Sequence, residues 1–283
     1  MAQTDLTTTV VAIEIIDEST VHVLVVTNDI RDNYVSELKS LKGERFDSVE
    51  VLLRVPEWLT GFTSPRPDLS YVSRWDDTLY EVAGSVTTVR RPCEAMTRVT
   101  PGPDGQVFAT CYGGLVQKLS QGKWEQISLG RDVDLFEVLP TGEEAFYVCG
   151  DEGTLAHCAG RRISFFDLPT DMPLFALARD SSDQIVAGGE GVLFRGGGEQ
   201  WEALDADDIT FHHARRHQKS VLLGGGERGL YKLRDSTLTQ VHGDVYAYYV
   251  ATCDEVIATC GDNKAWVVRP DGRILLEFDH LAY

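Results

Sequence analysis

The sequence contains few basic residues for its length. Its 283 residues include 26 Lys and Arg against 44 Asp and Glu, which gives a formal net charge of −18 at pH 7. Binding to nucleic-acid phosphates or to an anionic membrane requires clustered Lys and Arg. The composition therefore predicts that neither nucleic acid nor a membrane is a partner, and it favours a basic one.

Long apolar segments and paired cysteines are also missing. The most apolar N-terminal stretch, residues 10–16, is interrupted by Glu14, and no segment reaches the roughly 18 consecutive apolar residues that cross a bilayer. The first basic residue is Arg31, so the N-terminus lacks the positively charged start of a secretory signal. The six cysteines form no CxxC pair. We therefore expect a cytoplasmic protein with reduced cysteines.

Helical periodicity is absent, and a repeat of about 38 residues takes its place. A glycine that opens a strand recurs every 38 residues at Gly84, Gly122, Gly160 and Gly198. A small residue ends a short apolar strand in each repeat, at intervals of 38, 38, 39, 36 and 36 residues: Ser73, Cys111, Cys149, Gly188, Gly224 and Cys260. Four short strands in roughly 40 residues, with glycine at the turns, are typical of a β-propeller blade.

Six such repeats cover residues 59–283, and residues 1–58 differ from them. Residues 10–17 and 20–27 are expected to form a hairpin, 33–41 a short helix or irregular strand, and 48–55 a further strand. We expect an all-β protein, a seven-bladed β-propeller of four-stranded blades with residues 1–58 as an atypical first blade. The alternative is six blades with an N-terminal cap. In either case residues 1–58 pack against 256–283, and residues 1–283 form one monomeric domain.

Two segments of the repeat carry a family resemblance. Residues 113–125 and 191–202 resemble the Asp-box (BNR) and YVTN-type repeats of propellers similar to photosystem assembly factors, which combine a Gly-x-apolar strand, an Asp-x-Gly turn and a Trp. The run Ser120-Gln-Gly-Lys-Trp124 lacks the Asp of that box. The resemblance implies the fold over about five blades. It does not imply one function, since propellers include hydrolases, lyases, lectins and scaffolds.

Blade topology divides the connections between two faces. The turn after the second strand of each blade and the link between blades share one face, here called the top face. We expect acidic residues to gather on it, whereas most basic residues fall on the opposite face. The predicted partner-binding residues are Asp76, Asp77, Asp132, Asp134, Asp151, Glu152, Asp171, Glu190, Asp207, Asp208, Glu227, Asp244 and Asp262. The alternative is a solvated acidic rim that serves solubility.

Aromatic residues at the same turns are candidate hot spots for binding. Trp75, Tyr112 and Trp266 lie at or next to turns that follow second strands, so we expect them to be exposed on the top face.

Four aspartates recur just before innermost strands, at intervals of 37, 37 and 36 residues: Asp134, Asp171, Asp208 and Asp244. We expect them around the upper mouth of the central channel. They could hold a divalent cation or a partner's Lys or Arg, or accept backbone N–H groups within the links. We favour the last interpretation and expect no metal or cofactor.

Common catalytic motifs are missing. The sequence has no Gly-x-Ser-x-Gly elbow, and the glycine runs 196–198 and 224–226 lack the Lys and Ser or Thr of a phosphate-binding loop. His212, His213 and His217 are expected in a solvated basic turn, and the cysteines of the small-residue position are expected to serve packing. We predict no catalytic residues.

These observations favour a non-enzymatic, cytosolic protein-binding propeller. Its acidic top face would cap a basic protein, and an immunity-type inhibitor of a toxin is one such role. The alternatives are a metal-dependent propeller hydrolase or lyase with carboxylates at the channel mouth, and a glycan-binding or assembly-factor propeller.

Overall fold

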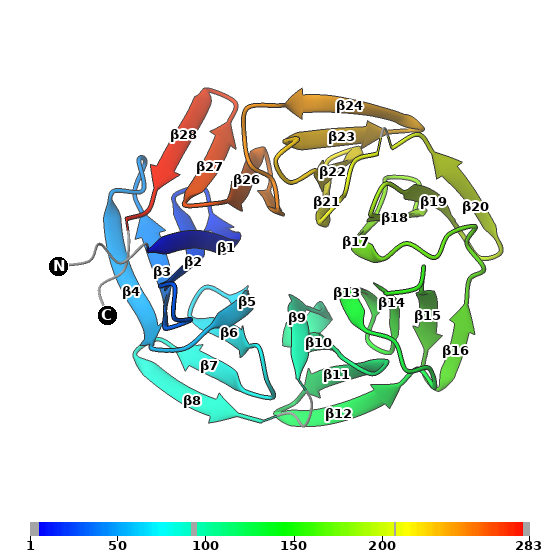
Figure 1. Cartoon of the computed structure of the whole chain (residues 1–283), viewed down its shortest axis with the longest axis horizontal. Helices are drawn as coiled ribbons and strands as arrows, with labels where there is room; N and C mark the ends of the chain where they lie inside the picture. The colour runs from blue at the N-terminus through cyan, green and yellow to red at the C-terminus, as the bar shows by residue number, and fades with distance from the viewer. Residues whose placement is uncertain (1–5, 92–94, 207, 280–283) are drawn as a thin grey trace.

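The computed structural model describes residues 6–91, 95–206 and 208–279. They form seven four-stranded antiparallel sheets that surround a central channel (Figure 1). Each sheet consists of four strands consecutive in sequence, so the predicted seven-bladed propeller is confirmed. Residues 33–41, for which a short helix was one of two expectations, fall almost entirely within a strand, Tyr34–Lys42.

Each blade contributes one strand to each of four concentric positions. The innermost strands are β1 (Thr7–Asp17), β5 (Leu59–Arg66), β9 (Met96–Pro101), β13 (Leu135–Gly142), β17 (Leu174–Arg179), β21 (His213–His217) and β25 (Tyr249–Cys253). The second strands are β2 (Thr20–Asn28), β6 (Leu69–Arg74), β10 (Val107–Cys111), β14 (Ala145–Gly150), β18 (Ile185–Gly189), β22 (Ser220–Gly224) and β26 (Val256–Gly261).

The two outer positions complete the blades. The third strands are β3 (Tyr34–Lys42), β7 (Leu79–Ala83), β11 (Leu115–Ser120), β15 (Leu155–Ala159), β19 (Leu193–Gly197), β23 (Leu230–Arg234) and β27 (Lys264–Arg269). The outermost strands are β4 (Ser48–Val55), β8 (Val86–Arg90), β12 (Lys123–Ser128), β16 (Arg162–Phe165), β20 (Gln200–Leu204), β24 (Thr237–His242) and β28 (Gly272–Glu277). A single 3₁₀ turn, η1 (Pro103–Gly105), connects β9 to β10 within the described part of the chain.

The small-residue position lies where one blade meets the next. A Cβ added to Gly224 would come within 2.3 Å of the carbonyl oxygen of Ala247 in the following blade. Cys149 at the equivalent position donates its Sγ–H to the carbonyl of Leu174, at 3.2 Å. Cys111, Cys149 and Cys260 are fully buried, which confirms that these cysteines serve packing. A larger side chain here would push neighbouring blades apart.

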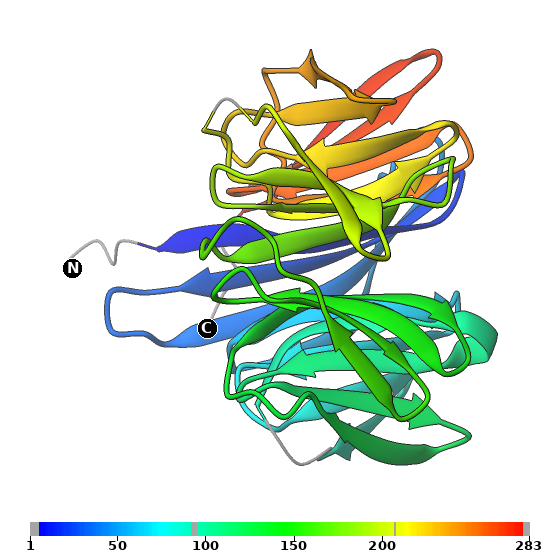
Figure 2. The same cartoon turned by 90° about the vertical axis from the view of Figure 1, so that its right-hand side faces the viewer.

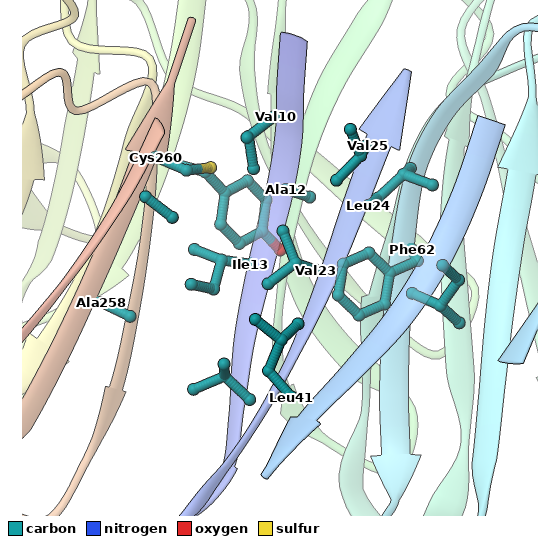
Figure 3. Packing of buried hydrophobic residues seen from close by; sticks show 14 of the residues in the cluster. Val10, Ala12, Ile13, Val23, Leu24, Val25, Leu41, Phe62, Ala258 and Cys260 are labelled. Carbon is teal, nitrogen blue, oxygen red and sulfur yellow. The ribbon is translucent and has the colours of Figure 1, made fainter. Parts of the chain in front are cut away.

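The ring closes without a strand shared between its ends. Blade 1 (β1–β4) and blade 7 (β25–β28) meet through one buried cluster, in which Ile13 of β1 lies on the side of Ala258 and Cys260 of β26 (Figure 3). The N–H of Val10 donates to the carbonyl of Asp262 at 2.6 Å. The predicted packing of residues 1–58 against the C-terminal segment is thus confirmed.

Arg269 of β27 joins the same two blades at the other face. Its guanidinium donates to the carbonyls of Glu44, at 2.8 Å, and Glu18, at 2.5 Å. It also lies 4.8 Å from the ring centre of Phe46. One basic side chain therefore ties two turns of blade 1 to blade 7.

The two faces are visible in the side view, where the long loop between β2 and β3 extends from the top face (Figure 2). None of the helical segments among the described residues is long and apolar enough to cross a membrane.

Candidate functional site

The acidic residues predicted for partner binding lie in the connections of the top face, with Asp207 outside the described residues. Most are exposed, whereas Asp76, Asp77, Asp134 and Asp151 are partly buried. The opposite face differs from the expectation, because its turns hold carboxylates beside bases such as Arg45, Arg161 and Lys219. Its acidic residues are Glu18, Glu44, Asp47, Asp68, Asp104, Glu143, Glu144, Asp180, Asp183, Glu199, Asp235, Asp254, Glu255 and Asp271. The excess of acidic over basic residues in the turns is therefore not confined to the top face.

Several top-face carboxylates already have partners. Arg74 binds Asp76, and this hydrogen bond lowers the pKa of Asp76 to about 2 despite partial burial. Arg273 of β28 binds Asp244 at 2.7 Å and lowers the pKa of that carboxyl. Such pairs are less available to a partner protein than free carboxylates.

The four recurring aspartates do not converge on one point. Asp244 is held by an outermost strand through Arg273, and Asp134 accepts the N–H of Gly113 at 3.4 Å. In the parts of the chain that the structure describes, no three His, Cys, Asp or Glu side chains are placed to share one metal ion. The expectation that these aspartates line the channel mouth is therefore corrected for Asp244, which is turned toward the outer wall.

The aromatic candidates divide into exposed and buried residues. Trp75 is 55% exposed and Tyr112 48% exposed, as expected. Trp266 is only 5% exposed, because it lies on β27 and packs against Tyr246, with ring centres 5.9 Å apart. The prediction of Trp266 as a contact residue is therefore wrong. Trp58, which the sequence argument missed, is 44% exposed and stacks on Tyr34.

A β-bulge recurs at the start of the innermost strands. In blades 1 to 5 one residue of the innermost strand is skipped by the pairing with the second strand. In blades 6 and 7 the equivalent residue stands directly before the strand and donates its N–H to the second strand. These seven bulge residues are Val11, Thr60, Thr97, Phe136, Phe175, His212 and Tyr248. Because a bulge redirects a side chain, each blade presents one residue at the channel mouth.

Four of the bulge residues form an aromatic arc across blades 4 to 7. Ring centres lie 5.1 Å apart between Phe136 and Phe175, 6.1 Å between Phe175 and His212, and 4.8 Å between His212 and Tyr248. All four remain partly exposed or exposed. Their spacing of 36 to 39 residues follows the repeat, so this arc was the signal that sequence reasoning could have used.

A buried polar layer lies next to the arc in the channel. Arg98 of β9 donates to the Glu137 carboxylate at 2.7 Å and to the carbonyls of Phe175 and His212 at 3.4 and 3.5 Å. Thr100 also donates to Glu137, at 3.0 Å. One arginine thereby connects blade 3 to blades 4, 5 and 6.

His213 belongs to this layer and not to a solvated turn, which corrects the expectation. It is fully buried, and its Nδ1 accepts the N–H of Val250 at 3.1 Å, so the ring proton is on Nε2. Nε2 faces Glu137 at 3.5 Å. Burial and the nearby Arg215 and Arg98 lower the pKa of His213 well below its usual value. The imidazole is therefore neutral at pH 7.

Two hollows open on the top face beside the arc. One, of about 250 Å³, is the channel mouth itself, lined among others by Thr60, Phe175 and Tyr248, with Arg98 also in its wall. The second, of about 440 Å³, lies between blades 6, 7 and 1 and is lined by Thr9, Val10, Val11, Glu227, Tyr246, Tyr248, Gly261 and Asp262. Val11 and Tyr248 separate the two hollows. Both are wide enough for a side chain of a partner.

Solved structures share this fold at low sequence identity. The WD40 β-propeller domain of Doa1 is 12% identical, with a TM-score of 0.74, and the match covers 99% of this chain and 95% of that chain. YCF48 bound to a D1 peptide is 11% identical, with a TM-score of 0.58 and coverage of 78% and 81%. The computationally designed Ika8 protein is 11% identical, with a TM-score of 0.65 and coverage of 96% and 97%. These similarities confirm the propeller fold expected from the resemblance.

No protein-family model matches the sequence, and no curated protein sequence does either. The site must therefore be interpreted from its own side chains.

Proposed function

We propose that this chain is a non-enzymatic protein-binding propeller whose top face binds a basic protein. The observation that carries the proposal is the neighbourhood of exposed carboxylates and exposed aromatic rings on one face. Trp75 lies two residues from the partly exposed Asp77 in one turn, and Tyr248 lines the hollow beside the channel mouth together with Glu227 and Asp262. Aromatic residues supply most of the binding energy at protein interfaces, and carboxylates select a basic partner and speed its association.

Two fold neighbours support a binding role. YCF48 was solved with a D1 peptide bound, and the Doa1 domain is a WD40 propeller. At such low sequence identity these two neighbours support only the propeller fold. The proposed partner is therefore inferred from the charged and aromatic side chains of this chain.

Within this class we propose that the protein is a monomeric, cytoplasmic inhibitor that caps a basic toxin. The exposed carboxylates of the top face, such as Glu190, Glu227 and Asp262, support a basic target. The cysteines among the described residues are mostly buried, and their burial supports a reducing compartment. If the partner is a toxin, its expression alone should arrest growth and co-expression of this chain should restore it. Growth unaffected by the partner would exclude the immunity role and leave the binding role standing.

Affinity capture with two charge-matched variants tests the binding role. The top-face variant carries Asp77→Asn, Asp171→Asn, Glu190→Gln and Glu227→Gln. The control, on the opposite face, carries Asp104→Asn, Glu144→Gln, Glu199→Gln and Glu255→Gln. Both remove four negative charges from partly or fully exposed positions.

The full chain should capture a protein of basic isoelectric point from an extract of its source cells. We expect the top-face variant to bind that partner about tenfold more weakly at low salt and the control to bind within about twofold of wild type. Equal losses in the two variants, or an acidic partner, would contradict the proposal.

A further inference from the structure

The Tyr248 ring is held in place by two glycine-containing turns. A Cβ at Gly261, the last residue of β26 before the turn to β27, would come within 2.5 Å of Tyr248 Cδ2. A Cβ at Gly226, in the turn between β22 and β23, would come within 3.3 Å of Tyr248 Cε1, and Gly226 has a φ of +59°. The ring lies against the backbone of both turns and is still 38% exposed. It is a preorganised aromatic surface.

Each of these turns places a carboxylate directly after its glycine. Glu227 follows Gly226 and Asp262 follows Gly261, and both are exposed. Asp244 is neutralised by Arg273, whereas no ion pair found among the described residues includes Glu227 or Asp262. Partial burial, followed by the charges of Glu227, Tyr246 and Asp262, raises the pKa of Tyr248. Two uncompensated negative charges therefore lie near its hydroxyl.

The hollow between these groups has a composition that suits one kind of ligand. Tyr246, Tyr248 and the partly buried Val11 line it together with the backbone at Val10, and its acids are Glu227 and Asp262. A cationic head is attracted to both aromatic rings and carboxylates, and its alkyl stem packs against valine. An anionic or purely apolar group would instead bury these carboxylates without a counter-charge.

We propose that the hollow beside Tyr248 binds one cationic side chain of a protein partner, arginine in preference to lysine. A planar guanidinium stacks on a tyrosine ring and bonds two carboxylates at once, which a compact ammonium does less well. The inference rests on the proposed function, because it assigns the anchor of the same basic partner to one hollow of the top face.

The test uses N-acetyl-arginine amide as the probe and the full chain labelled with ¹³C in its ten tyrosines. Tyr248→Phe removes one tyrosine signal and so assigns it. We expect the Tyr248 signal to shift saturably with the arginine probe, more weakly with N-acetyl-lysine amide, and hardly at all with the neutral N-acetyl-citrulline amide. A citrulline response equal to that of arginine, or no saturable shift, would overturn the proposal.

Two double variants separate the hollow from the general charge of the face. Glu227→Gln with Asp262→Asn should weaken the arginine probe about tenfold, which corresponds to about 1.4 kcal/mol. Asp171→Asn with Glu190→Gln removes the same charge elsewhere on the top face and should leave probe affinity within about twofold. Equal weakening by the two pairs would also contradict the assignment. Thermal unfolding at an unchanged temperature checks that each variant is folded.

The failure of this assignment is distinguishable from the failure of the proposed function. If arginine does not bind the hollow but partner capture still depends on the four top-face carboxylates, the anchor is wrong and the binding face stands. If capture is independent of those carboxylates while arginine binds at Tyr248, the hollow is a cation site and the proposed function is wrong.

Discussion

The channel mouth is built from seven equivalent positions, and its two halves carry different side chains. Blades 1 to 3 present Val11, Thr60 and Thr97, whereas blades 4 to 7 present the aromatic arc. The backbone bulge is shared, so the repeat determines where these side chains point and their identity determines what they can bind. The aromatic half adjoins the second hollow with its two carboxylates. Function is therefore expected on this half.

The aromatic half of the channel mouth is also held in place by more hydrogen bonds from the buried polar layer. Arg98 bonds the backbone at Phe175 and His212, and Glu137 holds Arg98 in place. A buried ion pair of this kind contributes little net stability, but breaking it leaves an uncompensated charge. Its role here is to hold the aromatic arc in position.

The largest effect is expected from Glu137→Gln. The substitution leaves the Arg98 guanidinium without its counter-charge in a largely buried site, and should lower the free energy of unfolding by about 3 kcal/mol. Urea unfolding measures this, with the exposed Glu125→Gln on β12 as the control. Amide exchange should accelerate at β17 and β21 before β1 and β5. Equal acceleration in both halves would contradict the assigned role of the polar layer.

Tyr248→Thr replaces one aromatic bulge residue by threonine, the residue that blades 2 and 3 carry at the equivalent position. We expect binding of the basic partner to weaken about tenfold because a preorganised ring is lost. Calorimetric titration with the captured partner measures the change. The control is Thr60→Val in the opposite half, which should keep affinity within about twofold. If Thr60→Val weakens binding as much, the two halves do not differ in function.

Arg269→Met tests the contact between blade 7 and blade 1. Blade 1 belongs to the half of the channel mouth that carries Val11, Thr60 and Thr97. The substitution removes two hydrogen bonds to carbonyls and the contact with Phe46, and should cost about 1 to 2 kcal/mol. Arg273→Met, which breaks an exposed pair with Asp244, should destabilise the protein less than Arg269→Met does, because solvent screens the pair. Chemical unfolding measures the loss in the free energy of unfolding for each of the two variants. A larger loss for Arg273→Met would show that closure does not depend on Arg269.

The smallest effect is a pH dependence at Glu14, also in blade 1. Burial raises the pKa of Glu14 to about 7 even though Ser64 donates its N–H to the carboxyl. A carboxyl whose pKa is raised on folding stabilises the protein below its ordinary pKa, and this stability is lost as the pH rises toward 7. Between pH 5 and pH 8 the wild-type protein should lose about 1 kcal/mol of its free energy of unfolding through Glu14, and Glu14→Gln should not show this decrease. The decrease is smaller than the whole pKa shift would give, because the side chain keeps some contact with water.

Unfolding curves of wild type and Glu14→Gln at pH 5 and pH 8 provide the comparison. The difference between the two proteins isolates Glu14 from His22, whose pKa is lowered to about 4 by burial and whose contribution is lost in the opposite direction, as the pH falls below about 6.5. An identical pH dependence in both proteins would contradict the assignment.

The sequence was sufficient to predict the blades because the repeat constrains backbone geometry. Gly84, Gly122, Gly160 and Gly198 have positive φ values of 58°, 75°, 56° and 58°. That conformation favours glycine, so glycine recurs in the sequence at the regular spacing of these turns. The atypical blade 1 was also predictable, because residues 48–55 and the preceding hairpin could not bury their apolar faces alone.

The site was predictable only in part, for two physical reasons. The bulge adds a residue to each innermost strand, so alternation alone could not place Phe175 or His212 at the mouth. The polar layer joins Arg98, Glu137 and His213 from three blades, and no local pattern signals such a meeting. Trp266 looked exposed because it is near a turn, yet it belongs to a buried cluster between blades 6 and 7 and packs against Tyr246.

Hydrogen exchange of the chain bound to its captured partner tests the central claim most directly. The account predicts slowed exchange in the top-face connections, strongest in the turns that carry Glu227 and Asp262 and in residues 243–248. The turns of the opposite face should be unchanged. Protection confined to the opposite face or to the outermost strands would contradict the proposal that this propeller binds its partner through the acidic, aromatic top face.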